Sequence, residues 1–322
     1  MTRRATITIL VLLAALALAA IARLLVGADS IHWPEDDAIL SIRAQRVAAA
    51  GLAGAALAVA GVLLQSLLRN PLASPDLLGL ASGGAFAVML VTYIAYRTGA
   101  TISPAITHGP AALVGALTAL GVVYALAQRR GMIEPVSLIL VGVIVTITCA
   151  AATTLIQSLM PPDPAQSAVR WLFGNISDEH TWPKLAVVSA AVAICTVIAL
   201  WASRAMDAAA LSDDEARSVG VPLGALRLIL FVTAGVLTAA AVVLAGPIGF
   251  VGLVCPHLVR MMAGPTHRPL VIGAFLAGAA LLITADATVK GVNLASGRLP
   301  IGVLTALIGG PIFVVLLRRA LR

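Results

Sequence analysis

Long apolar runs alternate with short polar stretches along almost the whole chain of 322 residues. A helix that crosses the hydrocarbon core of a bilayer needs roughly 20 apolar residues. The pattern predicts ten such helices, of which the eighth is the weakest because it is short and contains Pro256, His257 and Arg260. The predicted spans are Ala5–Val26, Val47–Leu68, Leu77–Tyr96, Pro110–Ala127, Val136–Met160, Leu185–Ser203, Leu228–Ala245, Ile248–Ala263, Leu270–Val289 and Ile301–Leu317.

The composition agrees with this pattern. Hydrophobic residues make up 60% of the chain, charged residues only 11%, and the mean hydropathy is +1.04. Because about one quarter of the residues of an average soluble domain are charged, this composition excludes that class. No segment has the length or polarity of a separate soluble domain, so we expect a single all-α transmembrane domain over residues 1–322. The three cysteines lie in apolar runs without the ligand spacing of a metal site.

The basic residues indicate the orientation of the bundle. Ten spans place both termini on the same side of the membrane. If that side is the cytoplasm, 13 of the 21 Lys and Arg residues lie inside and 7 outside, with Arg23 near the end of the first span. Cytoplasmic loops carry an excess of Lys and Arg. The distribution therefore predicts cytoplasmic termini.

The first apolar run has two interpretations. Arg3 and Arg4 precede it, and the small residues at 17–19 resemble a cleavage site, as in a secretory signal peptide. The apolar stretch of about 22 residues is longer than the core of a usual signal peptide. Its length favours a transmembrane helix.

A polar stretch, RNPLASPDLLG at 69–79, lies between two apolar runs and contains two prolines, an Asn, an Asp and an Arg. It is either a short loop outside the bilayer or irregular backbone that faces a cavity enclosed by protein. In the preceding run, Ala50, Gly54 and Ala58 share one helical face. This spacing suits close contact with another helix, although an alanine-rich helix also produces it by chance.

The fifth span carries Thr146, Thr153, Thr154 and Gln157 at offsets that place them on one helical face. One interpretation is an uncharged lining for a path that accommodates a bulky solute. The other is that the threonine hydroxyls bond to carbonyls of their own helix. Gln157, near the outer end, favours the path.

The longest predicted cytoplasmic loop, 204–227, contains a short amphipathic helix. Ser212 is a suitable N-cap, and Glu215 three residues later completes a capping box. Gly220 can end this helix. Taken alone, the helix either docks a partner or connects two spans.

Two ionisable residues inside predicted spans need an explanation. His257 is either structural or a proton relay, and no second histidine lies at helical spacing from it. Asp286 is a functional candidate, but it lies near the outer surface. Capping, or pairing with Lys290 one turn further on, is the simpler interpretation.

The chain lacks the motifs of an energy-coupling or hydrolytic enzyme. Its only lysines, Lys184 and Lys290, do not belong to a phosphate-binding Gly-x4-Gly-Lys-Ser/Thr loop. Neither His-Glu-x-x-His nor Gly-x-Ser-x-Gly is present. The centres of the spans hold essentially none of the buried ionisable groups that ion-driven carriers use. We therefore expect a non-catalytic transporter powered by an ATPase on another chain.

Three long motifs resemble the signatures of the FecCD-type permeases, the membrane subunits of ABC importers for ferric siderophores, haem and cobalamin. They are RNPLASPDLLG at 69–79, GPIGFVGLVCPHLVR at 246–260 and LPIGVLTALIGGP at 299–311, and WLFGN at 171–175 resembles the family's Trp-Leu-x-Gly element. The similarity covers nearly the whole chain. Its motif residues include Asn70, Pro71, Pro75, Gly79, Pro256, His257 and Arg260.

The resemblance implies a multi-pass permease of the bacterial inner membrane that works by alternating access. Two cytoplasmic ATPase subunits, a second permease subunit (identical or paralogous) and a periplasmic or lipid-anchored binding protein are the implied partners, with no nucleic acid among them. The permease itself is expected to bind no cofactor or metal. We expect a ferric siderophore as the cargo. Haem and cobalamin are the alternatives within the family, and an ion-coupled secondary transporter is the alternative from another class.

The resemblance also implies roles for individual residues. Coupling to the ATPase is expected at Ser212, Asp213, Asp214, Glu215, Ala216, Arg217 and Gly220, and binding-protein docking at Arg43, Arg46 and Lys290. A cytoplasmic gate is expected at Leu80, Ala81, Ser82, Pro135 and Val136. Two positions depart from the family pattern: Gln45 replaces a proline before Arg46, and Arg298 replaces an acidic residue before the third motif.

Overall fold

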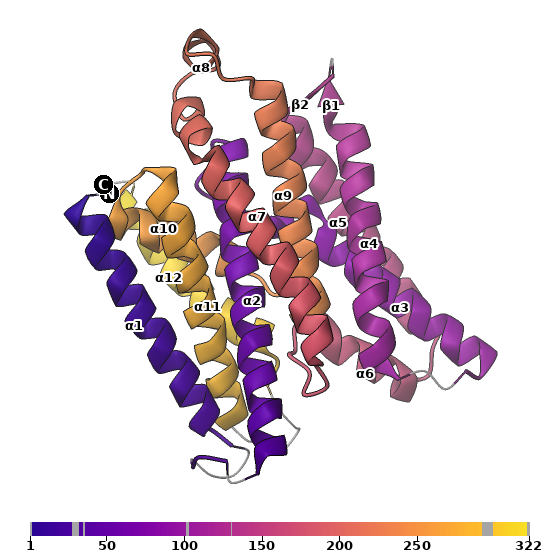
Figure 1. Ribbon diagram of the computed structural model, residues 1–322. Helices are drawn as coiled ribbons and strands as arrows, with labels where there is room; N and C mark the ends of the chain where they lie inside the picture. The colour runs from indigo at the N-terminus through magenta and orange to yellow at the C-terminus, as the bar shows by residue number, and fades with distance from the viewer. Residues whose placement is uncertain are drawn as a thin grey trace.

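The computed structural model describes residues 2–27, 32–34, 36–100, 103–129, 131–291 and 299–320, and these form a bundle of helices (Figure 1). Arg298 lies outside the described residues. Each of the ten predicted spans corresponds to a helix, which confirms the all-α membrane fold. These helices are α1 (Arg3–Leu25), α2 (Asp37–Leu67), α3 (Leu80–Thr98), α4 (Pro104–Ala127), α5 (Pro135–Ser158), α7 (Trp182–Ala209), α9 (Leu223–Ala245), α10 (Val251–Ala263), α11 (His267–Gly291) and α12 (Ile301–Ala320).

Five shorter elements complete the described part of the chain. The 3-10 helix η1 (Pro75–Leu78) follows α2, and the predicted amphipathic helix is α8 (Asp213–Ser218). Strands β1 (Gln128–Arg129) and β2 (Met132–Ile133) form an antiparallel hairpin between α4 and α5. Helix α6 (Pro162–Leu172) was not predicted, because it is short and mixes polar and apolar residues evenly.

The helices form two groups joined by α9 (Figure 1). One group contains α1, α2, α10, α11 and α12, and the other contains α3, α4, α5 and α6. Helix α9 packs on α2 from the first group and on α4 from the second. Helices α2 and α9 are mostly buried, whereas α5 exposes most of its surface in the isolated chain. Helix α5 therefore lies at the periphery of this subunit.

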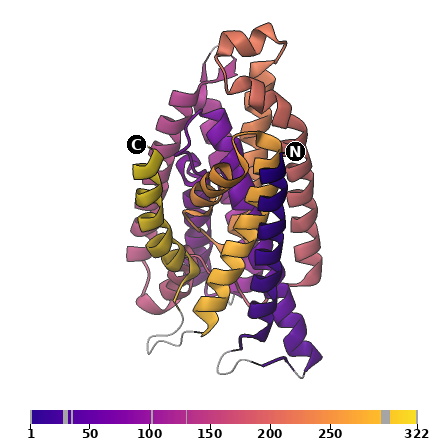
Figure 2. The same ribbon diagram turned by 90° about the vertical axis from the view of Figure 1, so that its left-hand side faces the viewer.

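The connections gather at the two ends of the bundle. Figures 1 and 2 place α8 at one end, with the start of α1 and the end of α12 in the same half of the molecule. The β1–β2 hairpin lies at the end that carries α8, and α6 lies at the other end (Figure 1). We call these the inner and the outer end, in agreement with the predicted orientation of the basic residues.

The small-residue face of α2 is a helix–helix interface. The backbones of α2 and α11 approach so closely that a Cβ atom at Gly54 would overlap the carbonyl oxygen of Gly278, and one at Gly278 would meet Ala58. Glycine in both helices allows this approach, as in other tightly packed membrane helices. The structure thus confirms the specific-interface interpretation of the spacing.

The eighth crossing is only partly helical. Residues 246–250 are extended between the end of α9 and the start of α10, and both Gly246 (φ 67°) and Phe250 (φ 68°) have left-handed backbone conformations. Helix α10 has 13 residues, which spans about 20 Å, less than the roughly 30 Å of a hydrocarbon core. Such irregular backbone is tolerated at membrane depth when protein surrounds it. The predicted helical span from Ile248 therefore starts three residues too early.

Candidate functional site

The first motif forms a compact turn between α2 and α3, which we call the gate segment (residues 69–82). The side-chain Oδ1 of Asn70 accepts a hydrogen bond from Leu72 N at 2.9 Å, and its carbonyl accepts one from Ala73 N at 3.0 Å. Pro75 begins η1, and Gly79 ends it with φ 71°, a conformation that favours glycine. Asn70 and Gly79 thus explain why the chain stops being helical here and then resumes.

The gate segment packs against α5. A Cβ atom at Gly142 would overlap the carbonyl oxygen of Leu77, and one at Gly79 would press on Val145. Of the predicted gate residues, Leu80 is buried and Ala81, Ser82 and Pro135 are half-buried, whereas Val136 is 63% exposed. Gly142 lies about two helical turns beyond Pro135. The structure therefore identifies Gly142 and Val145 as contact residues that the sequence did not single out.

Gln65 joins the first motif to the second. Its Oε1 accepts a hydrogen bond from Arg260 Nη2 at 3.0 Å, and its Nε2 lies 3.5 Å from the carbonyl oxygens of Ala73 and Gly252. Gln65 is buried in α2, and a buried amide requires such partners. A lone glutamine near the end of an apolar run was the available sequence signal. The second-motif residue Arg260 is therefore a structural link at the inner end.

Helix α8 is capped as predicted. Ser212 accepts a hydrogen bond from Glu215 N, and the Glu215 carboxylate accepts one from Ser212 N at 2.8 Å. Gly220 adopts φ 84° immediately beyond the helix, with open space around it. Serine hydrogen bonds lower the pKa of Glu215 below its usual value. The structure confirms the capping box, while the proposed contact with an ATPase stays a prediction.

The threonines of α5 bond to their own helix. Thr146, Thr153 and Thr154 donate to the carbonyls four residues earlier, at 2.7 to 3.1 Å. Thr153 is buried, whereas Thr154 and Gln157 are exposed. The four residues therefore do not share one open face, because Thr153 turns toward the bundle. Thr154 and Gln157 remain on the outward surface of α5.

Five charged residues form an ion-pair network at the outer end. Asp286 of α11 accepts hydrogen bonds from Arg23 Nε at 2.5 Å and from Arg46 Nη2 at 2.8 Å. Arg46 Nη1 also reaches Asp178 Oδ1 at 2.6 Å, and Lys290 Nζ lies 3.3 Å from Asp178 Oδ2. Although partial burial opposes it, Arg46 and Lys290 lower the pKa of Asp178 below its usual value. The network ties α1, α2, α11 and the segment after α6 together.

This network corrects one sequence prediction and bears on a second. Asp286 does not pair with Lys290; its partners are Arg23 and Arg46, which come from helices more than 200 residues earlier. Arg46 is 4% exposed and so does not present a free charge at the outer surface. Arg43 is also engaged: its Nη1 donates to the carbonyls of Leu24, Leu25 and His32. The docking role of these cations stays a prediction.

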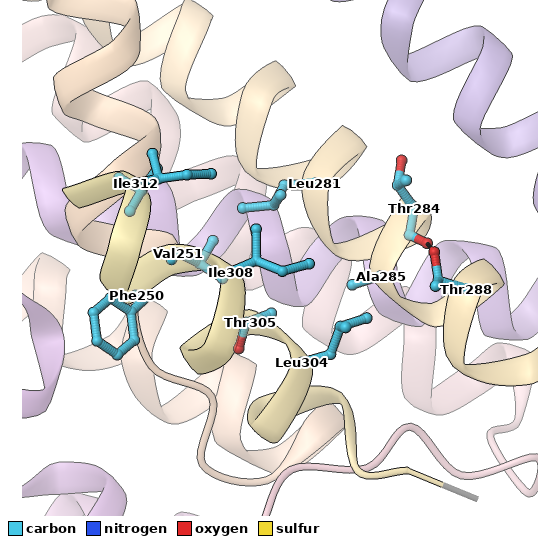
Figure 3. A pocket seen from close by; sticks show the side chains of 12 residues that line it. Phe250, Val251, Leu281, Thr284, Ala285, Thr288, Leu304, Thr305, Ile308 and Ile312 are labelled. Atoms are coloured by element: carbon cyan, nitrogen blue, oxygen red, sulfur yellow. Dashed lines mark hydrogen bonds between the residues drawn. The ribbon is translucent and has the colours of Figure 1, made fainter. Parts of the chain in front are cut away.

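Two cavities lie near these elements. A polar cavity of about 380 Å³ opens at the outer end, lined by Arg46, Arg170, Asn175, Asp178 and Glu179 among others. A smaller apolar cavity of about 100 Å³ lies between α10, α11 and α12, where Leu281, Ile308 and Ile312 gather around it (Figure 3). Its threonines are bonded to backbone carbonyls, as for Thr288 with Thr284 at 2.9 Å. This second cavity offers no polar anchor for a charged ligand.

His180, next to the outer network, is a buried histidine whose ring nitrogens have no hydrogen-bond partner among the described residues. Burial, helped by nearby Lys184, lowers its pKa to about 4. The folded protein therefore binds a proton at this ring less readily than the unfolded protein does, since the unfolded pKa is about 6.5.

We expect acid to destabilise the protein through His180. Because the folded pKa is the lower one, the contribution is complete above about pH 6.5 and is lost as the pH falls toward 4, by up to about 3 kcal/mol. Thermal unfolding in detergent at pH 6.5 and 4.5 measures this loss. The His180→Gln variant should show a much smaller loss over that interval. Equal losses in both proteins would exclude His180 as the cause.

The fold and the site together define a polytopic membrane permease. Its crossings pack closely through glycine, the eighth is only partly helical, and a capped helix projects at the inner end. The family follows from comparison with known proteins.

A profile of the FecCD transport family matches residues 5–319, and the chain belongs to this family. It is 36% identical over 280 residues to the hemin transport system permease protein HmuU of Yersinia pestis, covering 87% of this chain and 83% of that protein. It is 35% identical over 284 residues to the vitamin B12 import system permease protein BtuC of Serratia proteamaculans, covering 87% and 82%. The chain is thus an ABC importer permease of the inner membrane.

Solved structures agree. A structure described as an inward-facing conformation of a metal-chelate type ABC transporter superposes with a TM-score of 0.84 at 30% identity, covering 98% of this chain and 99% of that one. PsaBC from Streptococcus pneumoniae in complex with Fab superposes with a TM-score of 0.53 at 12% identity, covering 88% and 91%. The second likeness concerns the fold alone.

Proposed function

We propose that this permease carries a metal chelate, with a ferric siderophore as the first candidate, by alternating access. The observation that carries the proposal is the likeness, over 98% of the chain, to a metal-chelate type transporter. The outward surface of α5 has no charged residue from Pro135 to Ser158 and presents Thr154 and Gln157. An uncharged, weakly polar surface suits a bulky complex that must pass without being held tightly.

Haem and cobalamin are the second candidates, because relatives at 34 to 36% identity are named as hemin and cobalamin permeases. All three cargoes are large, metal-containing complexes. Their shared chemistry explains how closely related permeases can differ in cargo. The choice among them rests on the binding protein that presents the complex, as the family resemblance implies.

The proposed assembly contains two permease subunits, two ATPase subunits and a binding protein at the outer end. Helix α8 would contact the ATPase, since it projects beyond the other inner-end elements (Figure 1). At the outer end, an acidic side chain of the binding protein would compete with Asp178 for Lys290, because Asp178 is 44% exposed. Charge pairs at the rim of an interface orient docking more than they strengthen it.

Uptake into proteoliposomes tests the proposal. The vesicles contain the permease, its ATPase and its binding protein, and the probes are ferrioxamine B, hemin and cobalamin. Accumulation of ferrioxamine B that requires ATP inside the assembly supports the first candidate, and selective uptake of hemin or cobalamin replaces it with the second. Uptake driven by an ion gradient without ATP would contradict the ABC mechanism and favour a secondary transporter.

A further inference from the structure

Asp213, the first residue of α8, binds two arginines that belong to other elements. Arg69 Nη2 lies 2.6 Å from Asp213 Oδ1. Arg227 Nη2, from the first turns of α9, lies 2.9 Å from Oδ2 and 3.2 Å from Oδ1. One carboxylate thus joins α8 to α9 and to the gate segment.

The side chain of Arg69 makes a second contact, which fixes the orientation of its guanidinium group. Its Nε donates to the carbonyl of Ala209, the last residue of α7, at 2.9 Å. Its backbone has φ 47°, a left-handed conformation that is costly for a residue with a side chain. The chain adopts this conformation at the exit of α2 and thereby aims the guanidinium at α8. A hydrogen bond and an ion pair from one planar group give the link a defined geometry.

The distance from Arg69 to the packed part of the gate segment is short. Only five residues lie between it and Pro75, where η1 begins. The Asn70 turn, the ring of Pro71 and the contact between Gln65 and Ala73 stiffen this connection. At its far side, Leu77 touches Gly142 of α5. A displacement of α8 is therefore passed to η1 instead of being absorbed by a flexible loop.

We propose that Asp213 is a positioning residue that transmits movement of α8 to the gate segment through Arg69. This inference rests on the proposed function, because it needs an ATPase that moves α8. The pair is one-third exposed on each side, so its main contribution is direction and not stability. Arg227 keeps the carboxylate oriented while Arg69 follows it.

The test uses the permease–ATPase complex in nanodiscs with a Ser82→Cys reporter and Cys149→Ala to remove the more accessible native thiol. The rate of maleimide labelling at position 82 is measured with and without ATP. In Asp213→Asn, we expect the ATP-dependent change in rate to fall by about fivefold or more, the lower range of coupling between linked sites. Co-purification of the ATPase and its ATP hydrolysis are measured in the same samples, so that a variant that has lost the ATPase is distinguished from one that has lost the transmission.

Asp207→Asn is the matched control. Asp207 has a similar exposure of 40% and pairs with His267 of α11, and none of its hydrogen bonds or ion pairs among the described residues involves the gate segment, so its removal should leave the ATP-dependent change intact. Arg69→Gln should reproduce the Asp213→Asn effect, and the double variant should be no worse than either single one. Asp213→Glu should restore part of the response.

The outcomes separate the inference from the function on which it rests. If no ATPase associates with the permease, the proposed function fails. If ATP is hydrolysed but labelling responds equally in Asp213→Asn and the control, or does not respond in the reporter itself, the transmission through Asp213 is wrong.

Discussion

Replacing Asp286 with alanine should unfold this protein more readily than any other single removal of a charge. Asp286 is fully buried between Arg23 and Arg46, which are 1% and 4% exposed. Its loss leaves the buried guanidinium of Arg23 without a counter-charge and that of Arg46 with Asp178 alone. Removing one partner of a buried ion pair costs about 3–5 kcal/mol, because the remaining charge is neither solvated nor paired. We expect a loss of this size in the free energy of unfolding.

Denaturant or thermal unfolding in detergent measures the effect, with Asp178→Ala as the control. Asp178 also binds Arg46 but is 44% exposed, so its removal should cost about 1 kcal/mol or less. Adding Arg23→Met to Asp286→Ala should recover part of the loss, because it removes a buried cation that has lost its counter-charge. The buried-network interpretation fails if Asp286→Ala and Asp178→Ala are equally mild.

Substituting Gly54 with alanine should separate α2 from α11. The added methyl group would overlap the carbonyl oxygen of Gly278, which is backbone and cannot rotate away. Overpacking of this kind costs typically 1–3 kcal/mol, and we expect about 3 kcal/mol because the two helices must move apart. Unfolding measurements on the purified protein show the change.

Gly121 provides the matched control for this substitution. It lies inside α4, and a methyl group there would meet no atom within 4 Å. Gly121→Ala should be neutral or stabilising by up to about 1 kcal/mol, because alanine favours a helix over glycine. If both variants behave alike, the close approach of α2 and α11 does not contribute to stability.

Local patterns predicted most of the fold. The ten apolar runs became helices, and the Ser212–Glu215 box capped α8, because both depend on neighbours within a few residues. The sequence did not predict helix α6, because this helix is neither apolar nor long. The start of α10 escaped because the apolar residues of 246–250 are equally compatible with a helix and with an extended strand enclosed by protein.

Partners distant in sequence could not be predicted. The sequence identifies Asp286 as an acid that needs a partner. It predicts Lys290, four residues away, and gives no indication of Arg46, which is 240 residues away. The link from Arg69 to Asp213 also joins residues that are far apart in the sequence. Only the packing of α2 beside α11, and of α7 beside α2, brings these side chains together.

The outer ion-pair network has a consequence for the biosynthesis of the protein. A ribosome that adds 5–20 residues per second needs roughly 10 to 50 s to synthesise the 240 residues that separate Arg46 from Asp286. During that interval the nascent chain contains Arg23 in α1 without its counter-charge, and Arg46 in α2 can pair only with Asp178, which comes 132 residues after it. These helices must hold the arginines near the headgroups and settle into their final depth only when α11 enters the membrane. The N-terminal part of the permease is therefore synthesised first but reaches its final position in the membrane last.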